Sequence, residues 1–273
     1  MKKIILVTGG ANLIRRIIRD TSYNIISLDD YSAGSKKEIV KNKRIKYING
    51  NTLNIKKVLN NYKKKIFCTF HFGEFARIHQ SFFLTDQCFK SNVQGTFEVI
   101  NFCKDNGIRL IYSATSAALG NKGGDADLSP YAFTKAKNIE LLNNFNKWFN
   151  FKFDIIYFYN VYGSDQIADG FMATVIGIFE KQYLNNKPLT VVRPGSQKRK
   201  FTHIDDTIDA CMHVFKKKKY KQFSVSFDKS YSVIEIAKLF KSKIKYIPQR
   251  KGERHKSSIV QKIKGYKIIN IKA

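Results

Sequence analysis

The fold is decided by residues 4–30, which read IILVTGGANLIRRIIRDTSYNIISLDD. A short apolar run, Ile4 to Val7, opens into the turn Thr8-Gly9-Gly10-Ala11, and a second run, Ile25 to Leu28, ends in Asp29-Asp30. A glycine turn between a strand and a helix lets the backbone approach a pyrophosphate, and an acid at the end of the next strand can bond ribose hydroxyls. Taken alone, the pattern fits an ordinary turn and a solvated strand end equally well.

Similar apolar runs recur along the first 160 residues, and stretches with helical periodicity separate them. Continuous apolar strands that alternate with helices predict a parallel sheet covered on both faces. The expected fold class is therefore α/β, a doubly wound, Rossmann-like parallel sheet with ligands at the carboxyl ends of its strands. Further strands are expected at Ile45–Ile48, Ile66–Phe72, Leu110–Ser113 and Phe153–Phe158, and helices at Val93–Cys103 and Ala132–Trp148.

Glycine and proline become frequent after Asn160, which predicts a second, smaller part of the molecule. We expect residues 1–160 to form a dinucleotide-binding, Rossmann-like domain. Residues 161–273 should form mainly a substrate-binding lobe, with some segments returning to the first domain. Helices of this part are expected at Ala173–Leu184, Asp205–Phe215 and Val233–Phe240.

The chain is strongly basic, since Lys and Arg outnumber Asp and Glu by 49 to 21, a formal net charge of +28. Such a charge attracts polyanions. The excess is mostly Lys scattered among Asn and Ile, which is typical of a biased genome and not of an aromatic-interleaved nucleic-acid patch. We therefore do not expect nucleic acid as a partner, although binding through net charge stays open and predicts a steep salt dependence.

The cysteine positions and the N-terminal sequence indicate the cellular compartment in which we expect the protein. Cys68, Cys88, Cys103 and Cys211 lie in apolar surroundings without a Cys-x-x-Cys pair or an adjacent His, so we expect reduced core thiols and no metal site. The apolar run at the N-terminus is too short for a signal peptide, and no stretch is long enough to cross a bilayer. These features predict a soluble cytoplasmic protein without a membrane partner.

A helix that carries chemistry is predicted after Ser129 and Pro130, which suit the N-cap and the first helical position. Tyr131 and Lys135 then lie one turn apart on the same face. A phenol with a pKa of about 10 is a poor base at neutral pH unless a nearby cation favours its phenolate, and Lys135 together with a positively charged nicotinamide would supply that field. Tyr-x-x-x-Lys is also common by chance, but the small hydroxyl residues of Ser113-Ala114-Thr115-Ser116 lie at the end of a buried strand, and a hydroxyl there can share a substrate proton with Tyr131.

The order of these motifs is similar to that of the extended short-chain dehydrogenase/reductase family, particularly its UDP-glucose 4-epimerase-like members. The resemblance covers nearly the whole chain, and it implies NAD as the cofactor. The implied cofactor-binding residues are Thr8, Gly9, Gly10, Ala11, Asp29, Asp30, Asn51, Tyr131 and Lys135. The motifs that carry it are Thr8-Gly9-Gly10-Ala11, Leu28-Asp29-Asp30, Asn92-Val93-Gln94-Gly95-Thr96, the Thr115 segment, Tyr131-x-x-x-Lys135 and Asn160-Val161-Tyr162-Gly163.

The same resemblance implies roles at the reacting centre. Thr115, Tyr131 and Lys135 would be the catalytic hydroxyl, the base and its activator. Asn92 would be the structural and catalytic asparagine before the central helix.

The resemblance also implies a substrate site and a partner. Thr115, Asn160, Arg199 and Arg250 would bind a nucleotide sugar, with a UDP-hexose expected. The two arginines would clamp its diphosphate, a role that suits the guanidinium fork. Arg199 lies in Gln197-Lys198-Arg199-Lys200-Phe201-Thr202-His203-Ile204-Asp205-Asp206 and Arg250 in Pro248-Gln249-Arg250-Lys251-Gly252-Glu253, which are similar to the family's Arg-Asp-Phe-x-His-Val-Asp-Asp and Arg-Pro-Gly-Glu segments.

Family members usually dimerise through the helix after Asn92 and the helix bearing Tyr131. We therefore expect a homodimer. The apolar spacing of Phe97, Ile100 and Phe102 on the first of these helices permits it.

The residues after Thr115 limit which reactions of the family we expect. Dehydrating members resemble Thr-Asp-Glu at this point, and decarboxylating members have a Glu two residues beyond the hydroxyl, where this chain has Ser116 and Ala117. Neither can act as a carboxyl acid or base. The expected activity is NAD-dependent epimerisation at C4 of a nucleotide-diphosphate sugar through a 4-keto intermediate. Two alternatives stay open: another nucleotide-sugar reductase or dehydratase, and a catalytically inactive nucleotide-binding relic.

One motif departs from the family. Its fingerprint Thr-Gly-Gly-Ala-Gly-Phe-Ile-Gly corresponds here to Thr8-Gly9-Gly10-Ala11-Asn12-Leu13-Ile14-Arg15, without the second and third glycines. Our interpretation is that a short segment has been deleted, which predicts weaker cofactor binding. In addition, Asn51 stands where an Asp usually meets adenine.

Overall fold

A parallel sheet of eight strands forms the centre of the protein, in a computed structural model that describes residues 3–33, 36–217, 222–227, 229–250 and 266–269. The strand order is β14-β11-β6-β5-β4-β1-β2-β3, and every neighbouring pair is parallel. The predicted doubly wound α/β fold is thus confirmed. The strands are β1 (Ile4–Thr8), β2 (Asn24–Asp29), β3 (Ile45–Asn49), β4 (Ile66–His71), β5 (Arg109–Thr115), β6 (Phe153–Phe158), β11 (Gln222–Val225) and β14 (Tyr266–Ile269).

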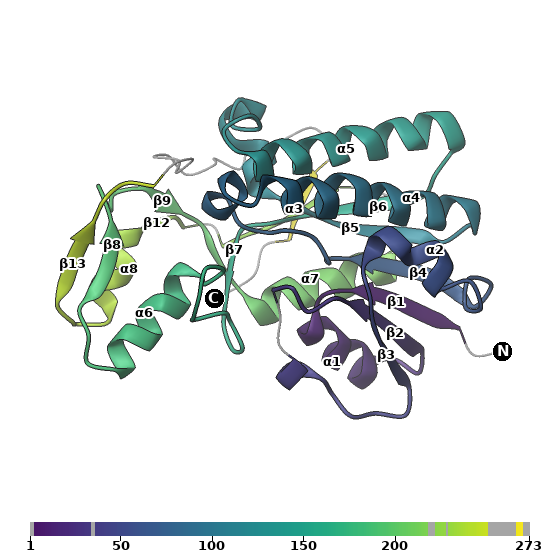
Figure 1. Cartoon of the computed structure of the whole chain (residues 1–273), viewed down its shortest axis with the longest axis horizontal. Coiled ribbons are helices and arrows are strands. Elements are labelled where there is room, and N and C mark those ends of the chain that lie inside the picture. The colour runs from purple at the N-terminus through teal and green to yellow at the C-terminus, as the bar shows by residue number, and fades with distance from the viewer. Residues whose placement is uncertain (1–2, 34–35, 218–221, 228, 251–265, 270–273) are drawn as a thin grey trace.

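Helices cover both faces of the sheet (Figure 1). Side chains alternate along a strand, so Ile4 and Leu6 of β1 face one helical layer and Ile5 and Val7 face the other. The first layer contains α2 (Ile55–Val58), α3 (Thr85–Phe89), α4 (Thr96–Asp105) and α5 (Pro130–Phe149), and the second contains α1 (Ala11–Asp20) and α7 (Ile204–Lys217).

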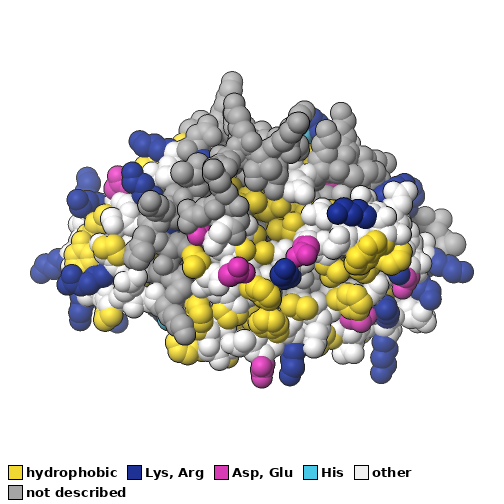
Figure 2. Space-filling view, turned by 90° about the horizontal axis from the view of Figure 1, so that it is seen from above, with side chains coloured by type: hydrophobic (Ala, Val, Ile, Leu, Met, Phe, Trp, Pro, Cys, Tyr) yellow, Lys and Arg dark blue, Asp and Glu magenta, His cyan; other side chains and the backbone are white. Residues whose placement is uncertain are grey.

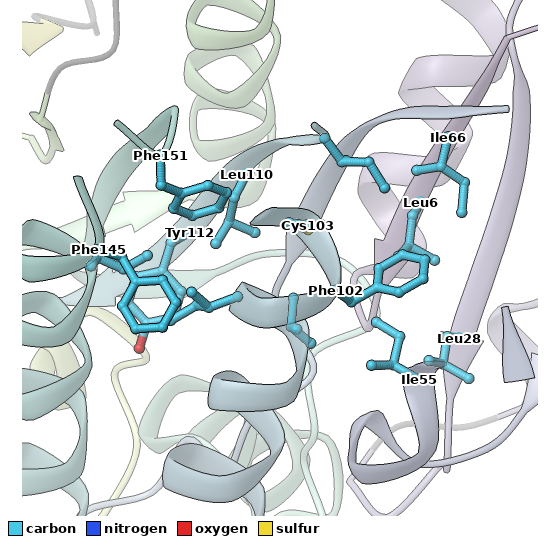
Figure 3. Packing of buried hydrophobic residues seen from close by; sticks show 14 of the residues in the cluster. Leu6, Leu28, Ile55, Ile66, Phe102, Cys103, Leu110, Tyr112, Phe145 and Phe151 are labelled. Atoms are coloured by element: carbon cyan, nitrogen blue, oxygen red, sulfur yellow. The ribbon is translucent and has the colours of Figure 1, made fainter. Parts of the chain in front are cut away.

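The core beneath α4 and α5 is aromatic (Figure 3). Phe102 of α4 and Phe145 of α5 pack with Leu110 and Tyr112 of β5. Burial of these side chains fixes both helices against the sheet. The expectation that Ile100 and Phe102 contribute to a dimer interface is therefore wrong, because both face this core, with exposures of 0% and 2%. Of the three residues, only Phe97 points to the surface, with an exposure of 42%.

Local signals explain where the helices begin. Ser129 Oγ accepts a hydrogen bond from the amide of Ala132 at 3.1 Å, and Pro130 takes the first helical position of α5, as predicted. The helix predicted from Val93 instead starts with a π-helical turn, Lys90–Gly95, and becomes α-helical at Thr96. π-Helical turns are rare and often lie at functional sites.

A smaller group of elements lies to one side of the sheet (Figure 1). α6 (Val175–Leu184) and α8 (Val233–Leu239) pack on the strand pair β8 (Leu189–Val192) and β13 (Ile244–Ile247) through Phe179, Val191 and Ala237. α7 and β11, although they lie in sequence between β8 and α8 of this group, pack into the main sheet. The remaining short pairs are β7 (Asn160–Tyr162) with β10 (Phe201–His203) and β9 (Lys198–Arg199) with β12 (Tyr231–Ser232), and the short helical turns are η1 (Lys36–Glu38), η2 (Thr52–Asn54), η3 (His79–Phe82), η4 (Lys90–Gly95) and η5 (Ser116–Gly123).

Two further predictions concern the whole chain. All four cysteines are buried and free, as expected. Burial raises the pKa of the Cys68 and Cys103 thiols to about 12, which keeps them protonated and unreactive. In the part of the chain that the structure describes, no helix has the length and apolar character to span a membrane.

Candidate active site

One cavity of about 750 Å³ opens at the carboxyl ends of β1, β2, β4 and β5. Gly9, Asp29 and Asn51 line one part of it, and Tyr131 and Lys135 line another. The predicted substrate residues border the same cavity and are contributed by the smaller group of elements: Asn160, Arg199 and Arg250. The structure therefore brings most of the predicted site residues into one space, which we call the site cavity.

The glycine turn borders the site cavity in a tightly packed conformation. Gly9 and Gly10 have φ angles of 70° and 77°, which side chains other than glycine rarely adopt. A Cβ on Gly10 would lie 2.9 Å from the ring of Phe72, and one on Gly9 would lie 3.0 Å from the amide nitrogen of Gly73. α1 begins at Ala11, directly after this turn. The turn and the start of α1 leave the cavity open, with Ala11 in its wall.

Thr8 lies beneath this turn and not in the cavity wall. Its side chain is fully buried, and its Oγ1 is 2.7 Å from Nδ1 of His71 and accepts a hydrogen bond from the amide of Gly73 at 3.1 Å. Burial lowers the pKa of His71 to about 4, so that the imidazole is neutral at pH 7. In this structure Thr8 ties the glycine turn to the segment that follows β4.

The three polar residues predicted for the adenosine end lie together. The Asp29 carboxylate accepts a hydrogen bond from the amide of Tyr31 at 2.8 Å, and Asn51 Nδ2 donates to Asp30 at 2.9 Å. Burial raises the pKa of Asp29, and its side chain still borders the cavity. Carboxylate oxygens at the end of the second strand are suited to accept hydrogen bonds from ribose hydroxyls.

Thr115, Tyr131 and Lys135 all line the site cavity. Thr115 ends β5, and its Oγ1 accepts a hydrogen bond from the amide of Ala117 at 3.2 Å, which fixes the side chain. Tyr131 is 9% exposed at the start of α5, and its amide donates to Ser81 Oγ at 3.2 Å. A hydroxyl, a phenol and an ammonium thus line one space, as the motifs predicted.

Lys135 has a partner that the sequence interpretation missed. Its ammonium forms an ion pair with Glu74 and donates to the backbone oxygen of Ser113 at 2.5 Å. The side chains of Lys135 and Glu74 are only 5% and 2% exposed. Burial lowers the pKa of Lys135, and the charge and hydrogen bond of Glu74 oppose that shift. The signal in the sequence was a Glu three residues after the buried strand β4.

Both carboxylate oxygens of Glu74 have polar partners. Its Oε1 accepts hydrogen bonds from Thr96 Oγ1 at 2.9 Å, from the Tyr112 hydroxyl at 3.0 Å and from Asn138 Nδ2 at 3.1 Å, while Oε2 faces Lys135. An acceptor of so many donors is an ionised carboxylate. The Glu74–Lys135 pair is therefore a built part of the site.

Asn92 lies in the π-helical turn, fully buried and outside the cavity wall. Its Oδ1 accepts from the amide of Phe75 at 2.7 Å, and its Nδ2 donates to the Phe75 oxygen at 3.1 Å and to Thr134 Oγ1 at 3.1 Å. These bonds tie α5 to the segment that carries Glu74. The structure gives Asn92 a positioning role and no contact with the cavity.

The predicted diphosphate residues come from two separate strands and a connecting segment. Asn160 starts β7 and donates from Nδ2 to the oxygen of Lys200 at 3.0 Å, while Arg199 ends β9. Arg250 follows β13 and borders the same cavity, whereas Gly252 and Glu253 of its motif lie outside the described residues.

The chain belongs to the NAD dependent epimerase/dehydratase family, whose model matches residues 5–226. NAD is therefore its cofactor. The chain is 27% identical over 226 residues to an uncharacterized UDP-glucose epimerase, YtcB, of Bacillus subtilis, covering 75% of this chain and 70% of the relative. It is also 24% identical over 266 residues to a dTDP-D-glucose 4,6-dehydratase of Dictyostelium discoideum, covering 86% of this chain and 60% of the relative.

The fold is shared with solved structures. A crystal structure of UDP-glucose 4-epimerase from Thermotoga maritima with UDP-glucose matches with a TM-score of 0.87 and 21% identity, over 95% of this chain and 90% of that one. At this identity the likeness establishes the fold. The relatives include epimerases as well as dehydratases, so membership of the family leaves the particular reaction open.

Proposed function

We propose that this protein epimerises a nucleotide-diphosphate hexose, with a UDP-hexose as substrate, at C4. The observation that carries the proposal is the shared space of Thr115, Tyr131 and Lys135 with the glycine turn and with Arg199 and Arg250. A dinucleotide and a sugar nucleotide would meet in this space.

The residues present fit NAD. The backbone of Gly9 and Gly10 can approach a pyrophosphate, Asp29 and Asp30 offer acceptors for the ribose, and the cavity continues to Tyr131. Bound there, NAD would accept a hydride from a sugar carbon and return it. The protein's own contribution is the handling of the proton and the orientation of the sugar.

In the proposed reaction Tyr131 takes the proton of the C4 hydroxyl, and Thr115 donates a hydrogen bond to the oxygen that becomes the ketone. The keto sugar turns over in the cavity, and Tyr131 returns the proton when the other face is reduced. Arg199 and Arg250 hold the diphosphate, which anchors the nucleotide while the sugar turns. The proposal needs no further acid or base.

The available carboxylates favour epimerisation over dehydration. Ser116 and Ala117 follow Thr115, as the sequence shows. Glu74, the carboxylate beside Lys135, is fully occupied by its hydrogen bonds, and Asp165 in the cavity wall forms an ion pair with Arg15. Elimination requires a free acid or base next to the reacting carbons.

Interconversion of UDP-glucose and UDP-galactose by the purified protein with added NAD tests the proposal. We expect turnover by the wild type and loss of at least about a hundredfold in kcat for Tyr131→Phe. The nucleotide released on denaturation, identified by its ultraviolet spectrum and mass, distinguishes epimerisation from the alternative functions. Copurifying NAD with no sugar turnover would point to another reaction of the family, and protein that neither carries nor binds NAD would point to the relic.

We also propose a homodimer through α4 and α5. Phe97, Phe133, Trp148 and Phe149 on these helices are between 36% and 62% exposed. Figure 2, which views the molecule from above, shows several groups of hydrophobic side chains on this face, with acidic and basic side chains between them. Large exposed apolar patches mark association sites. Sedimentation of the wild type and of Phe97→Lys tests this, since the charged variant should be monomeric.

A further inference from the structure

Arg77 is a cation of the site cavity that the proposed reaction does not use. It follows β4 in the segment that carries Glu74, and its half-buried side chain lines the cavity. Its Nε donates to the oxygen of Met172 at 2.7 Å and its Nη1 to the oxygen of Ala76 at 2.9 Å. Both acceptors are uncharged, and no carboxylate of the described residues forms an ion pair with Arg77. The Nη2 group and one N–H of Nη1 are therefore left to donate to a ligand.

The other Lys and Arg side chains of the cavity wall have a partner or a proposed role. Lys135 forms its ion pair with Glu74, and Arg199 and Arg250 are proposed to hold the diphosphate. The bonds of Arg77 to two backbone oxygens need N–H donors but no charge. A half-buried charge without a counter-ion is unfavourable, so the charge of Arg77 indicates a ligand with an anionic group beside it.

The contacts of this segment place Arg77 at the reacting end of the cavity. Met172, whose backbone oxygen Arg77 binds, packs against the apolar cluster that contains Tyr131, and so does Ile78, the next residue along the chain. Ser81 of the same segment accepts the hydrogen bond from the amide of Tyr131 at 3.2 Å. Arg77 therefore belongs to the part of the wall that is built around Tyr131.

We propose that Arg77 binds a carboxylate on the sugar, so that the preferred substrate is a UDP-hexuronate. The inference rests on the proposed function in taking a nucleotide sugar as the ligand of the site cavity. If the C4 hydroxyl lies at Tyr131 and Arg199 and Arg250 hold the diphosphate on C1, the exocyclic groups nearest to C4 are the C3 hydroxyl and C6. In a hexuronate C6 is a carboxylate, which matches the planar donors of a guanidinium. Arg77 would then determine which sugar is bound.

The turning of the sugar during epimerisation makes the preference depend on the epimer. The ring presents opposite faces to NAD in the two halves of the proposed reaction, so C6 changes its place in the cavity. Arg77 can then meet the carboxylate in only one of the two orientations. We therefore expect one of the two C4 epimers, UDP-glucuronate or UDP-galacturonate, to bind more tightly than the other.

The test is a calorimetric titration, with NAD added, in the Tyr131→Phe background, where no turnover is expected. The ligands are UDP-glucose, UDP-galactose and the two corresponding hexuronates. We expect the better hexuronate to bind about tenfold to a hundredfold more tightly than its neutral counterpart, as a charge-assisted hydrogen bond provides. Arg77→Gln, which keeps N–H donors for the backbone oxygens, should abolish this preference, and Arg77→Lys should keep part of it.

A matched variant controls for the high net charge of the chain. Arg19, with a side chain that is 69% exposed, lies outside the wall of the site cavity, so Arg19→Met removes one positive charge and should leave the preference unchanged.

Two outcomes would overturn the proposal: neither hexuronate binds more tightly than its neutral counterpart, or the preference survives in Arg77→Gln. The first comparison needs no substitution of Arg77, so it stands even if the Arg77 variants do not fold. Turnover by the wild type separates this inference from the proposed function. Preferential binding of a hexuronate without epimerisation of any nucleotide sugar would contradict only the proposed reaction, whereas interconversion of UDP-glucose and UDP-galactose without that preference would contradict only the role of Arg77. A protein that binds none of the four ligands would contradict both.

Discussion

Glu74→Gln is predicted to destabilise the fold by about 3 kcal/mol at pH 7. The substitution keeps the size of the side chain and some of its acceptor capacity, but it leaves the ammonium of Lys135 buried without an anion. Removing one partner of a buried pair costs about 3–5 kcal/mol, and the retained amide oxygen places this case at the lower end. Urea unfolding followed by circular dichroism measures the change as a shift in midpoint at constant slope.

The loss of stability caused by Glu74→Gln should depend on pH, and its direction can be worked out. Burial lowers the folded-state pKa of Lys135, and loss of Glu74 lowers it further, whereas the unfolded chain keeps that proton up to about pH 10.4. The unfolded state therefore binds more protons in this interval, and stability rises with pH there. The penalty of Glu74→Gln is complete below the variant's folded pKa and shrinks as the pH rises toward 10.

Two controls bracket this prediction. Tyr112→Phe removes a single donor to Glu74, a bond of 3.0 Å, and should cost only about 1 kcal/mol. Lys135→Met added to Glu74→Gln removes the stranded charge and should recover most of the loss. A Glu74→Gln protein within about 0.5 kcal/mol of the wild type, with a difference independent of pH, would refute the ion-pair reasoning.

Three further predictions concern the supporting structure. Arg109 pairs with the fully buried Asp154 at 2.8 Å, so Arg109→Met should cost about 3–5 kcal/mol in urea unfolding and Arg109→Met/Asp154→Leu should recover part of it. The pKa of His71 is lowered by burial to about 4, so up to about 3 kcal/mol of stability should be lost as the pH falls from 6.5 to 4, and His71→Gln should flatten that decline. A Cβ on Gly95 would overlap the Thr52 hydroxyl, so Gly95→Ala should cost about 1–3 kcal/mol in thermal unfolding, and Thr52→Ala should relieve it.

The sheet could be predicted from the sequence because its first six strands are continuous apolar runs. The observed β1 to β6 coincide with those runs to within two residues at each end. β11 and β14 were not predicted individually, because four-residue strands such as Gln222–Val225 carry too few residues to show a period. The positions of β11 beside β6 and of β14 beside β11 depend on contacts made by residues far apart in the chain.

The candidate site was predictable where a motif is local. Tyr131 and Lys135 lie on one helix, so their spacing alone places them on one face, and the cavity confirms that they share a space. The partner of Lys135, Glu74, follows a different strand, and nothing in the sequence around Lys135 indicates it. Asn92 was predicted as a site residue, but its direction away from the cavity depends on a π-helical turn, which sequence periodicity did not reveal.

The hydrogen bonds beneath the site connect the glycine turn to Lys135, and each bond of this network has a defined donor and acceptor. Thr96 donates to Glu74, so its oxygen is left to accept from Nε2 of His71 at 2.9 Å. Nδ1 of His71 must then accept from the Thr8 hydroxyl, which requires a neutral imidazole and agrees with its low pKa. Because Glu74 also holds Lys135, the turn and the ammonium are fixed by one network of buried side chains. The position of Lys135 should therefore be maintained by the core whether or not a dinucleotide is bound, and a substitution in the glycine turn that weakens cofactor binding need not displace Lys135.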